Sequence, residues 1–157
     1  MADRRPANPG FEVMAVRALA LDVGEKRIGI AVSDPLGVIA TSKTALVRKN
    51  KATDVAALAA LIEREAVGVV IIGMPLSLAG GEGPQALRVR QFVAALEAEI
   101  TAPIRFWDER YTTVEAERLL RERGVKAEKV RAQVDSFAAA LLLQEYLDAE
   151  RRPEVPV

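Results

Sequence analysis

Residues 18–34 read Ala-Leu-Ala-Leu-Asp-Val-Gly-Glu-Lys-Arg-Ile-Gly-Ile-Ala-Val-Ser-Asp. Two apolar segments, 18–23 and 28–32, flank the polar turn 24–27, and this pattern predicts a β-hairpin. Asp22 is the exception, because it lies inside the first apolar segment. An ionised carboxylate is unfavourable there unless it is paired, hydrogen-bonded or bound to a cation. The stretch therefore indicates either an acid used in metal or phosphate chemistry or an aspartate that only stabilises its own turn.

The composition narrows the chemistry of any site. The chain has 157 residues, of which 50% are apolar and 28% charged, as expected for one globular domain. It contains neither cysteine nor histidine. Disulfides, thiolate or histidine metal sites and imidazole bases are therefore excluded. A metal site would have to use oxygen ligands, which favours Mg²⁺ or Mn²⁺ over zinc.

The charge pattern bears on partners and location. The 22 basic and 22 acidic residues give a net charge of zero, so nucleic-acid binding would have to come from local clusters of basic residues. No apolar run has the length of a membrane helix, and the N-terminus has no signal-peptide pattern. We expect a cytoplasmic protein without a membrane partner.

Hydrophobic periodicity predicts a mixed α/β fold. The hairpin and a third strand form an antiparallel meander, and further strands alternate with helices, which indicates a five-stranded mixed sheet covered by helices on both faces. The predicted strands are 38–48, 67–72 and 104–107, the predicted helices 54–66, 85–100, 112–123 and 133–149, and 74–84 is a predicted loop. Residues 1–15 are expected to form a flexible arm, 16–149 the domain and 150–157 a flexible tail.

Two further acids could join Asp22. Glu109 follows the last predicted strand, and Asp135 lies in the predicted first turn of the last helix, on the face that carries Ala138, Ala139 and Leu142. If the strands before Asp22 and Glu109 are parallel neighbours, the three carboxylates could converge. They could then bind two Mg²⁺ or Mn²⁺ ions about 3.5–4 Å apart, the arrangement that cleaves phosphodiesters.

Each acid also has a purely structural interpretation. Asp135 at a helix start would interact favourably with the helix dipole, and Glu109 could simply pair with Arg110. Asp34 is predicted to be a turn residue, and Asp108 should face the side opposite Glu109. Phe106 and Trp107 are expected in the core.

Four motifs together resemble the signatures of one protein family. They are residues 21–34, the loop Ile72-Gly73-Met74-Pro75-Leu76, Asp108-Glu109-Arg110-Tyr111-Thr112-Thr113, and Val134-Asp135-Ser136-Phe137-Ala138-Ala139-Ala140. In this order and spacing they are similar to the YqgF family, also called RuvX, over about residues 17–149. Members are described as Holliday junction resolvases and, more often now, as pre-16S rRNA nucleases.

The resemblance implies an RNase H-like fold with Asp22, Glu109 and Asp135 as catalytic, metal-binding acids. We expect residues of the same motifs and of the basic stretch 118–131 to contact substrate, namely Lys26, Arg27, Gly73, Pro75, Arg110, Thr112 and Arg131. Phosphate contacts from such residues position a nucleic-acid backbone without reading its sequence.

Several functions stay open from the sequence. A metal-dependent nuclease that matures the 5′ end of precursor 16S rRNA is favoured, acting as a monomer or weak dimer, with DNA cleavage possible. The alternative is a Holliday junction resolvase, which should be a stable two-fold dimer. A non-catalytic nucleic-acid or ribosome-binding module is a further alternative. An ATPase of the actin and sugar-kinase type would need two such domains.

Overall fold

A computed structural model describes residues 16–75, 81–108 and 118–151 of the chain. Within the last helix the side chains of residues 127, 128, 130–133, 135 and 151 lie outside the description. The predicted arm over 1–15 and most of the predicted tail also fall outside it, so the division into arm, domain and tail stays a prediction.

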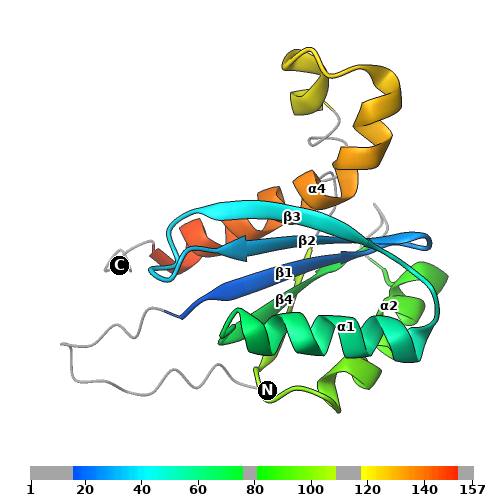
Figure 1. Ribbon diagram of the computed structural model, residues 1–157, viewed down its shortest axis with the longest axis vertical. Helices are drawn as coiled ribbons and strands as arrows, with labels where there is room; N and C mark the ends of the chain where they lie inside the picture. The colour runs from blue at the N-terminus through cyan, green and yellow to red at the C-terminus, as the bar shows by residue number, and fades with distance from the viewer. Residues whose placement is uncertain (1–15, 76–80, 109–117, 152–157) are drawn as a thin grey trace.

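The sheet has five strands in the order β3-β2-β1-β4-β5. Strands β1, β2 and β3 pair antiparallel, whereas β4 pairs parallel with both β1 and β5. This confirms the predicted mixed sheet with an antiparallel meander (Figure 1). The strands are β1 Ala18–Val23, β2 Arg27–Ser33, β3 Ala40–Val47, β4 Val69–Met74 and β5 Ile104–Asp108.

The hairpin between β1 and β2 is tight because of Gly24. Its N–H donates to the carbonyl oxygen of Arg27 at 2.9 Å. A Cβ atom at this position would lie 2.7 Å from the same oxygen, which is too close for any side chain. Glycine is therefore required for the backbone to approach itself here, and the turn fixes the register that pairs Asp22 with Gly29.

Three helices complete the layers, with α1 and α2 on one face of the sheet and α4 on the other (Figure 1). They are α1 Lys51–Arg64, α2 Pro84–Glu97 and α4 Ala127–Arg151. We call the two sides the α1/α2 face and the α4 face. None of the helices in the described part of the chain is long and apolar enough to cross a membrane.

Alternate strand residues build two different cores. On the α1/α2 face, the strands contribute large side chains such as Leu19, Leu21 and Ile72, which pack against Phe92 and other helix residues. On the α4 face, the strands contribute small residues such as Ala18, Ala20 and Ala31, which allow the long helix to lie close. By this alternation Asp22 belongs to the α4 face.

The first helix begins three residues before its predicted start at Asp54. Asn50 is its N-cap, and the side-chain oxygen accepts the Thr53 N–H at 2.8 Å. Asparagine suits this position because it satisfies one of the N–H groups that the first turn leaves unbonded. Because the N-cap is Asn50, Asp54 lies inside the first turn and is not the first residue of the helix.

The last helix begins at Ala127, six residues before its predicted start at Gln133. The apolar periodicity begins only at Val134, whereas residues 127–133 are mostly strong helix formers without an apolar stripe. The preceding residues 118–122 are helical, and Gly124, with φ of +79°, follows them as predicted. The predicted capping box at 112–115 lies outside the described residues.

Strand β4 is shifted two residues toward the C-terminus of the chain: it spans Val69–Met74, whereas the predicted strand is 67–72. Gly73 and Met74 were assigned to the end of the strand and to the loop after it, but they pair with Trp107 and Asp108 of β5. The continuing parallel ladder extends the strand because it bonds backbone groups whatever the side chain. Gly73 is therefore part of the strand. It directly follows Ile72, which pairs with Leu21 of β1.

Candidate nuclease centre

Asp22 lies next to the last residue of β1, on the α4 face of the sheet. Its strand neighbours Leu21 and Val23 are buried on the α1/α2 face, while Asp22 itself is half-buried. A carboxylate at the carboxyl end of a central strand is held by the sheet on both sides yet keeps access to the surface. This placement favours the predicted chemical role over the role of a turn stabiliser.

Glycines occupy the strand positions on both sides of Asp22. Its direct partner on β2 is Gly29. On β4, Gly73 directly follows Ile72, the partner of Leu21, and Gly73 in turn pairs with Trp107 on β5. Glycine has no side chain. Among the three positions Gly29, Asp22 and Gly73, only Asp22 therefore places a side chain on the α4 face.

Helix α4 runs over this face antiparallel to β1. In its second half, Gln144 accepts the Ala40 N–H and donates to the Val38 carbonyl oxygen, both at 3.0 Å, at the start of β3. Tyr146 accepts a hydrogen bond of 2.6 Å from Arg105 near the start of β5. Because these contacts lie at the amino end of β1, the first half of α4 lies toward the end that carries Asp22 (Figure 1).

Asp135 belongs to that first half, but not to the first turn, as was predicted. With the helix beginning at Ala127, it lies in the third turn. The helix-dipole explanation for an acid at this position therefore no longer applies. One turn later, Ala139 is fully buried against the sheet.

Ser136 is a feature that the sequence interpretation did not single out. Its residue is only 9% exposed, and its hydroxyl has no hydrogen-bond partner among the described residues. A buried hydroxyl without a partner is unfavourable by about 1–3 kcal/mol, so such groups are rare without a reason. Its position directly after Asp135 is the signal that could have identified it.

The remaining predicted acid cannot be compared with the structure. Glu109 follows Asp108, the last residue of β5, and lies outside the described residues together with Arg110 and Thr112. The idea that β1 and β5 are neighbours is wrong, because β4 lies between them and pairs with both. The two strands are nevertheless parallel, so their carboxyl ends are at the same edge of the sheet.

Predicted substrate contacts lie at the same end. Lys26 is exposed in the hairpin turn, Arg27 begins β2, and Pro75 follows β4 directly after Met74. The backbone of Arg131 is in α4. Within the basic stretch, Arg118 is paired with Glu122 at 2.5 Å, and the guanidinium carbon of Arg123 lies 5.2 Å from the ring centre of Phe137.

Other residues have structural roles. Asp34 is confirmed as a turn residue, since its carboxylate accepts the N–H groups of Val38 and Ile39 at 2.7 Å. The Ile39 N–H is the main cause that lowers its pKa. Phe106 is not in the core as expected: it is 40% exposed, with the Arg90 guanidinium carbon 4.7 Å from its ring centre. Trp107 does pack on the α4 core.

The donor set fits a hard divalent cation. Asp22 offers carboxylate oxygens at the carboxyl end of β1, and the chain has no softer nitrogen or sulfur ligand from histidine or cysteine. Among the side chains that the structure describes, no group of three acids could hold a metal ion. Glu109 and Asp135 are not among those side chains, so a site built by all three acids remains a matter for proposal.

Comparison with known proteins decides the family. A family model described as "RuvX: Holliday junction resolvase" matches residues 16–149. The chain belongs to the RuvX family. A relative from Koribacter versatilis is 46% identical over 132 residues, covering 84% of this chain and 86% of the relative. One from Syntrophus aciditrophicus is 45% identical over 141 residues, covering 90% and 94%. Both carry the provisional name pre-16S rRNA nuclease, and the match supports nuclease activity in this RuvX-family chain.

Solved structures confirm the RNase H-like fold that the resemblance implied. The RuvC protein of T. thermophilus in complex with a Holliday junction substrate matches with a TM-score of 0.58 at 15% identity, covering 86% of this chain and 95% of that one. The fowlpox virus resolvase with Holliday junction DNA matches with a TM-score of 0.51 at 13% identity, covering 87% and 99%. At such identities the likeness concerns the fold of the RuvX chain alone.

Proposed function

We propose that this RuvX-family chain is a metal-dependent nuclease that hydrolyses phosphodiester bonds in precursor 16S rRNA during ribosome maturation. The observation that carries the proposal is the position of Asp22: a half-buried carboxylate at the carboxyl end of a central strand, beside Gly29 and in line with Gly73. The names of its relatives supply the substrate.

In this proposal Asp22, Glu109 and Asp135 hold two Mg²⁺ or Mn²⁺ ions. Such ions activate a water molecule for attack and stabilise the departing oxyanion. Asp22 pairs with Gly29 of β2 and the preceding Leu21 pairs with Ile72 of β4, so the backbone is fixed and the carboxylate can move little. Lys26 in the adjoining turn, Arg27 at the start of β2 and Arg131 of α4 hold substrate phosphates in this proposal. A histidine base is not required for this chemistry.

RNA is the favoured substrate for a second reason. The chain has no net charge, so it lacks the broad positive field that draws a protein onto duplex DNA. A monomer or weak dimer in the cytoplasm that cuts one strand near a precursor end needs only local phosphate contacts. Because metal-bound phosphates resemble one another in RNA and DNA, some DNA cleavage is compatible with the same site.

Holliday junction resolution is the second candidate. The description of the family model favours it. Junction resolution requires two active sites related by a two-fold axis, because a four-way junction is cut by two symmetric incisions. A resolvase should therefore form a stable dimer on its substrate.

The test compares the two substrates directly. End-labelled precursor 16S rRNA fragments and labelled four-way junctions are incubated with the full chain in Mg²⁺, Mn²⁺ or excess chelator. The Asp22→Asn variant is the catalytic control, and Glu63→Gln is the matched acid-to-amide control, because Glu63 is exposed on α1 away from the site.

We expect the wild type and Glu63→Gln to cut the precursor RNA with either metal ion, and Asp22→Asn or chelator to abolish cutting. Paired symmetric nicks in the junction, a stable dimer by light scattering and intact RNA would instead establish the resolvase. Absence of cleavage of both substrates by folded protein would favour a non-catalytic binding module.

A further inference from the structure

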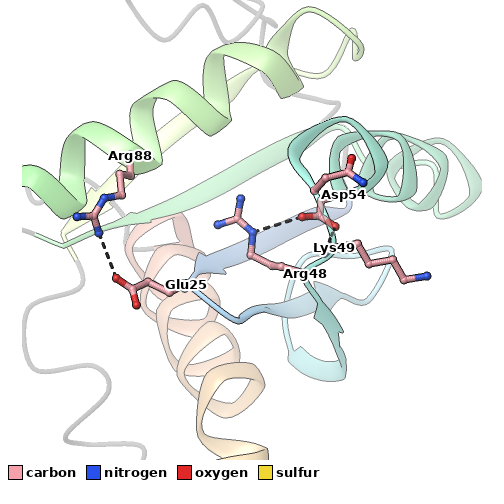
Figure 2. Close-up of a pocket in the computed structure, with 6 residues that line it drawn as sticks. Glu25, Arg48, Lys49, Asp54 and Arg88 are labelled. Atoms are coloured by element: carbon pink, nitrogen blue, oxygen red, sulfur yellow. Dashed lines mark hydrogen bonds and ion pairs between the residues drawn. The ribbon is translucent and has the colours of Figure 1, made fainter.

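A polar hollow lies on the α1/α2 side of the hairpin turn. It has a volume of about 470 Å³ and is lined by Glu25, Arg48, Lys49, Asn50, Asp54 and Arg88 (Figure 2). The residues come from the β1–β2 turn, the segment between β3 and α1, α1 itself and α2. None of them belongs to the proposed metal site. Hollows of this size commonly hold small ligands or parts of larger ones.

Arg48 is the organising residue of this hollow. Its Nε donates to Asp54 at 3.4 Å and its Nη1 to the carbonyl oxygen of Gly24 at 3.0 Å. Its guanidinium carbon also lies 4.9 Å from the ring centre of Phe92. These contacts fix the planar group in one orientation, and they leave Nη2 without a hydrogen bond to the described residues.

Asp54 explains why Arg48 is held so firmly. The carboxylate is only 1% exposed, and it also accepts the Lys49 N–H at 3.0 Å. A buried carboxylate needs a charged partner, so Arg48 cannot leave without a large loss of stability. The positive charge of Arg48 and the Lys49 N–H thereby compensate the negative charge of Asp54. The carboxylate therefore repels an anion in the hollow only weakly.

Arg88 forms the other side of the hollow. It donates to Glu25 at 3.1 Å, and both side chains are well exposed, at 63% and 77%. An ion pair this exposed contributes little to stability, so an incoming anion can readily replace the carboxylate. Figure 2 shows the Arg48 guanidinium between Asp54 on one side and the Glu25–Arg88 pair on the other, whereas the Lys49 side chain extends away.

We propose that Arg48 and Arg88 form a second phosphate-binding site, which receives a phosphate group of the nucleic acid outside the cleavage centre. The inference rests on the proposed nuclease function for the origin of the ligand. Arginine suits the task because its planar fork can donate two hydrogen bonds to one phosphate. Glu25 acts as a competing anion that occupies Arg88 when substrate is absent.

The location makes the site useful to the nuclease. Glu25 is three residues beyond Asp22, so the two backbones are at most about 11 Å apart. The turn between them is held from the hollow, since Arg48 bonds to Gly24 and the backbone N–H of Arg48 donates to the Lys26 carbonyl oxygen at 2.9 Å. A strand that crosses this turn could contact the metal site and the hollow together.

The test measures binding rather than cleavage. The full-length protein is kept in excess chelator, and its affinity is measured for a fluorescent single-stranded RNA 12-mer, for adenosine monophosphate and for inorganic phosphate. RNA integrity is checked on a gel. The variants are Arg88→Ala and Glu25→Gln, with Arg64→Ala as the matched control at the far, exposed end of α1. Arg48 is left intact because its removal would strand Asp54.

We expect Arg88→Ala to weaken RNA binding about 10-fold at low salt and to lower the salt dependence by about one phosphate contact. Glu25→Gln should strengthen binding about threefold, because it removes the competing carboxylate. Arg64→Ala should change it less than about twofold. The opposite directions of the first two variants separate a local site from a general loss of charge.

The small probes identify the source of the phosphate. Variant-dependent binding of RNA alone assigns the site to the substrate backbone, whereas the same dependence with the mononucleotide or with phosphate assigns it to a free phosphate ligand. Equal effects of Arg88→Ala and Arg64→Ala on every probe, with no gain in Glu25→Gln, overturn the site. Because binding is measured without metal, this result is independent of whether the chain cleaves RNA.

Discussion

The two faces of the sheet are built from different side chains. On the α1/α2 face, Leu21 and its neighbours fill the space with large residues that are completely buried. On the α4 face, β1 and β2 present alanines, Gly29 and one acid, Asp22, while β4 adds Val69 and Ile71. Bulk gives cohesion, because buried apolar area drives folding. The small residues of β1 and β2 allow α4 to lie close to the sheet.

The largest effect on cleavage activity is expected for substitutions of Asp22 and the two other acids of the proposed centre. Asp22→Asn, Glu109→Gln and Asp135→Asn should each reduce cleavage at least about 100-fold, because each removes a charged ligand from a site that depends on charge. Stability should stay the same or rise, since neutralising one of several crowded carboxylates relieves repulsion. Cleavage rates and thermal melts on the same preparations check both parts. Full activity in a folded variant would remove that acid from the centre.

Replacing the metal should have a similarly large effect. Mg²⁺ and Mn²⁺ should support cleavage, while Ca²⁺ should not, because it prefers more ligands at longer distances and would misplace the reacting groups. Rates are measured after dialysis against chelator and addition of each ion. Undiminished cleavage in chelator would end the metal-dependent proposal.

The two faces should be destabilised by opposite kinds of core substitution: loss of volume on the α1/α2 face and added volume on the α4 face. Leu21→Ala leaves a cavity on the α1/α2 face and should lower the free energy of unfolding by about 2–5 kcal/mol. Ala20→Leu adds bulk where α4 lies close and should lower it by about 1–3 kcal/mol. Both residues are fully buried and adjacent on β1. Urea unfolding measures the two values, and an unchanged stability in Ala20→Leu would show that the α4 face is not closely packed.

A smaller effect is expected at Ser136. Ser136→Ala removes a buried hydroxyl that has no partner among the described residues, so stability should be unchanged or rise by up to about 1 kcal/mol. Thermal unfolding tests this. A fall in cleavage without a fall in stability would indicate that the hydroxyl serves the centre. A clear loss of stability would instead reveal a structural hydrogen bond.

The smallest effect concerns the β2–β3 turn and its pH dependence. Backbone N–H groups, that of Ile39 foremost, lower the pKa of Asp34 below its ordinary value of 3.8. A lowered folded-state pKa means that Asp34 stabilises the fold above the unfolded pKa, and that this contribution is lost as pH falls through the folded pKa. The melting temperature of Asp34→Asn should therefore lie slightly below that of the wild type at pH 7. The gap should narrow toward pH 3.

The sequence by itself determined the strands, their hairpin and the class of chemistry. Alternating apolar residues around a glycine turn are local signals, and they gave β1, β2 and the position of Asp22 correctly. The absence of histidine and cysteine limited any metal site to oxygen ligands. The four motifs identified the RuvX family, which the comparisons confirm.

Only the tertiary structure decided which residues meet across the fold. Local periodicity could not show that α4 begins at Ala127, because its first turns are helix formers without an apolar stripe. It could not show that β4 separates β1 from β5, or that Arg48 neutralises a buried Asp54. Strand order and buried ion pairs depend on contacts between distant segments. The interaction energies of these contacts exist only in the folded chain, so a sequence pattern of a few residues cannot predict them.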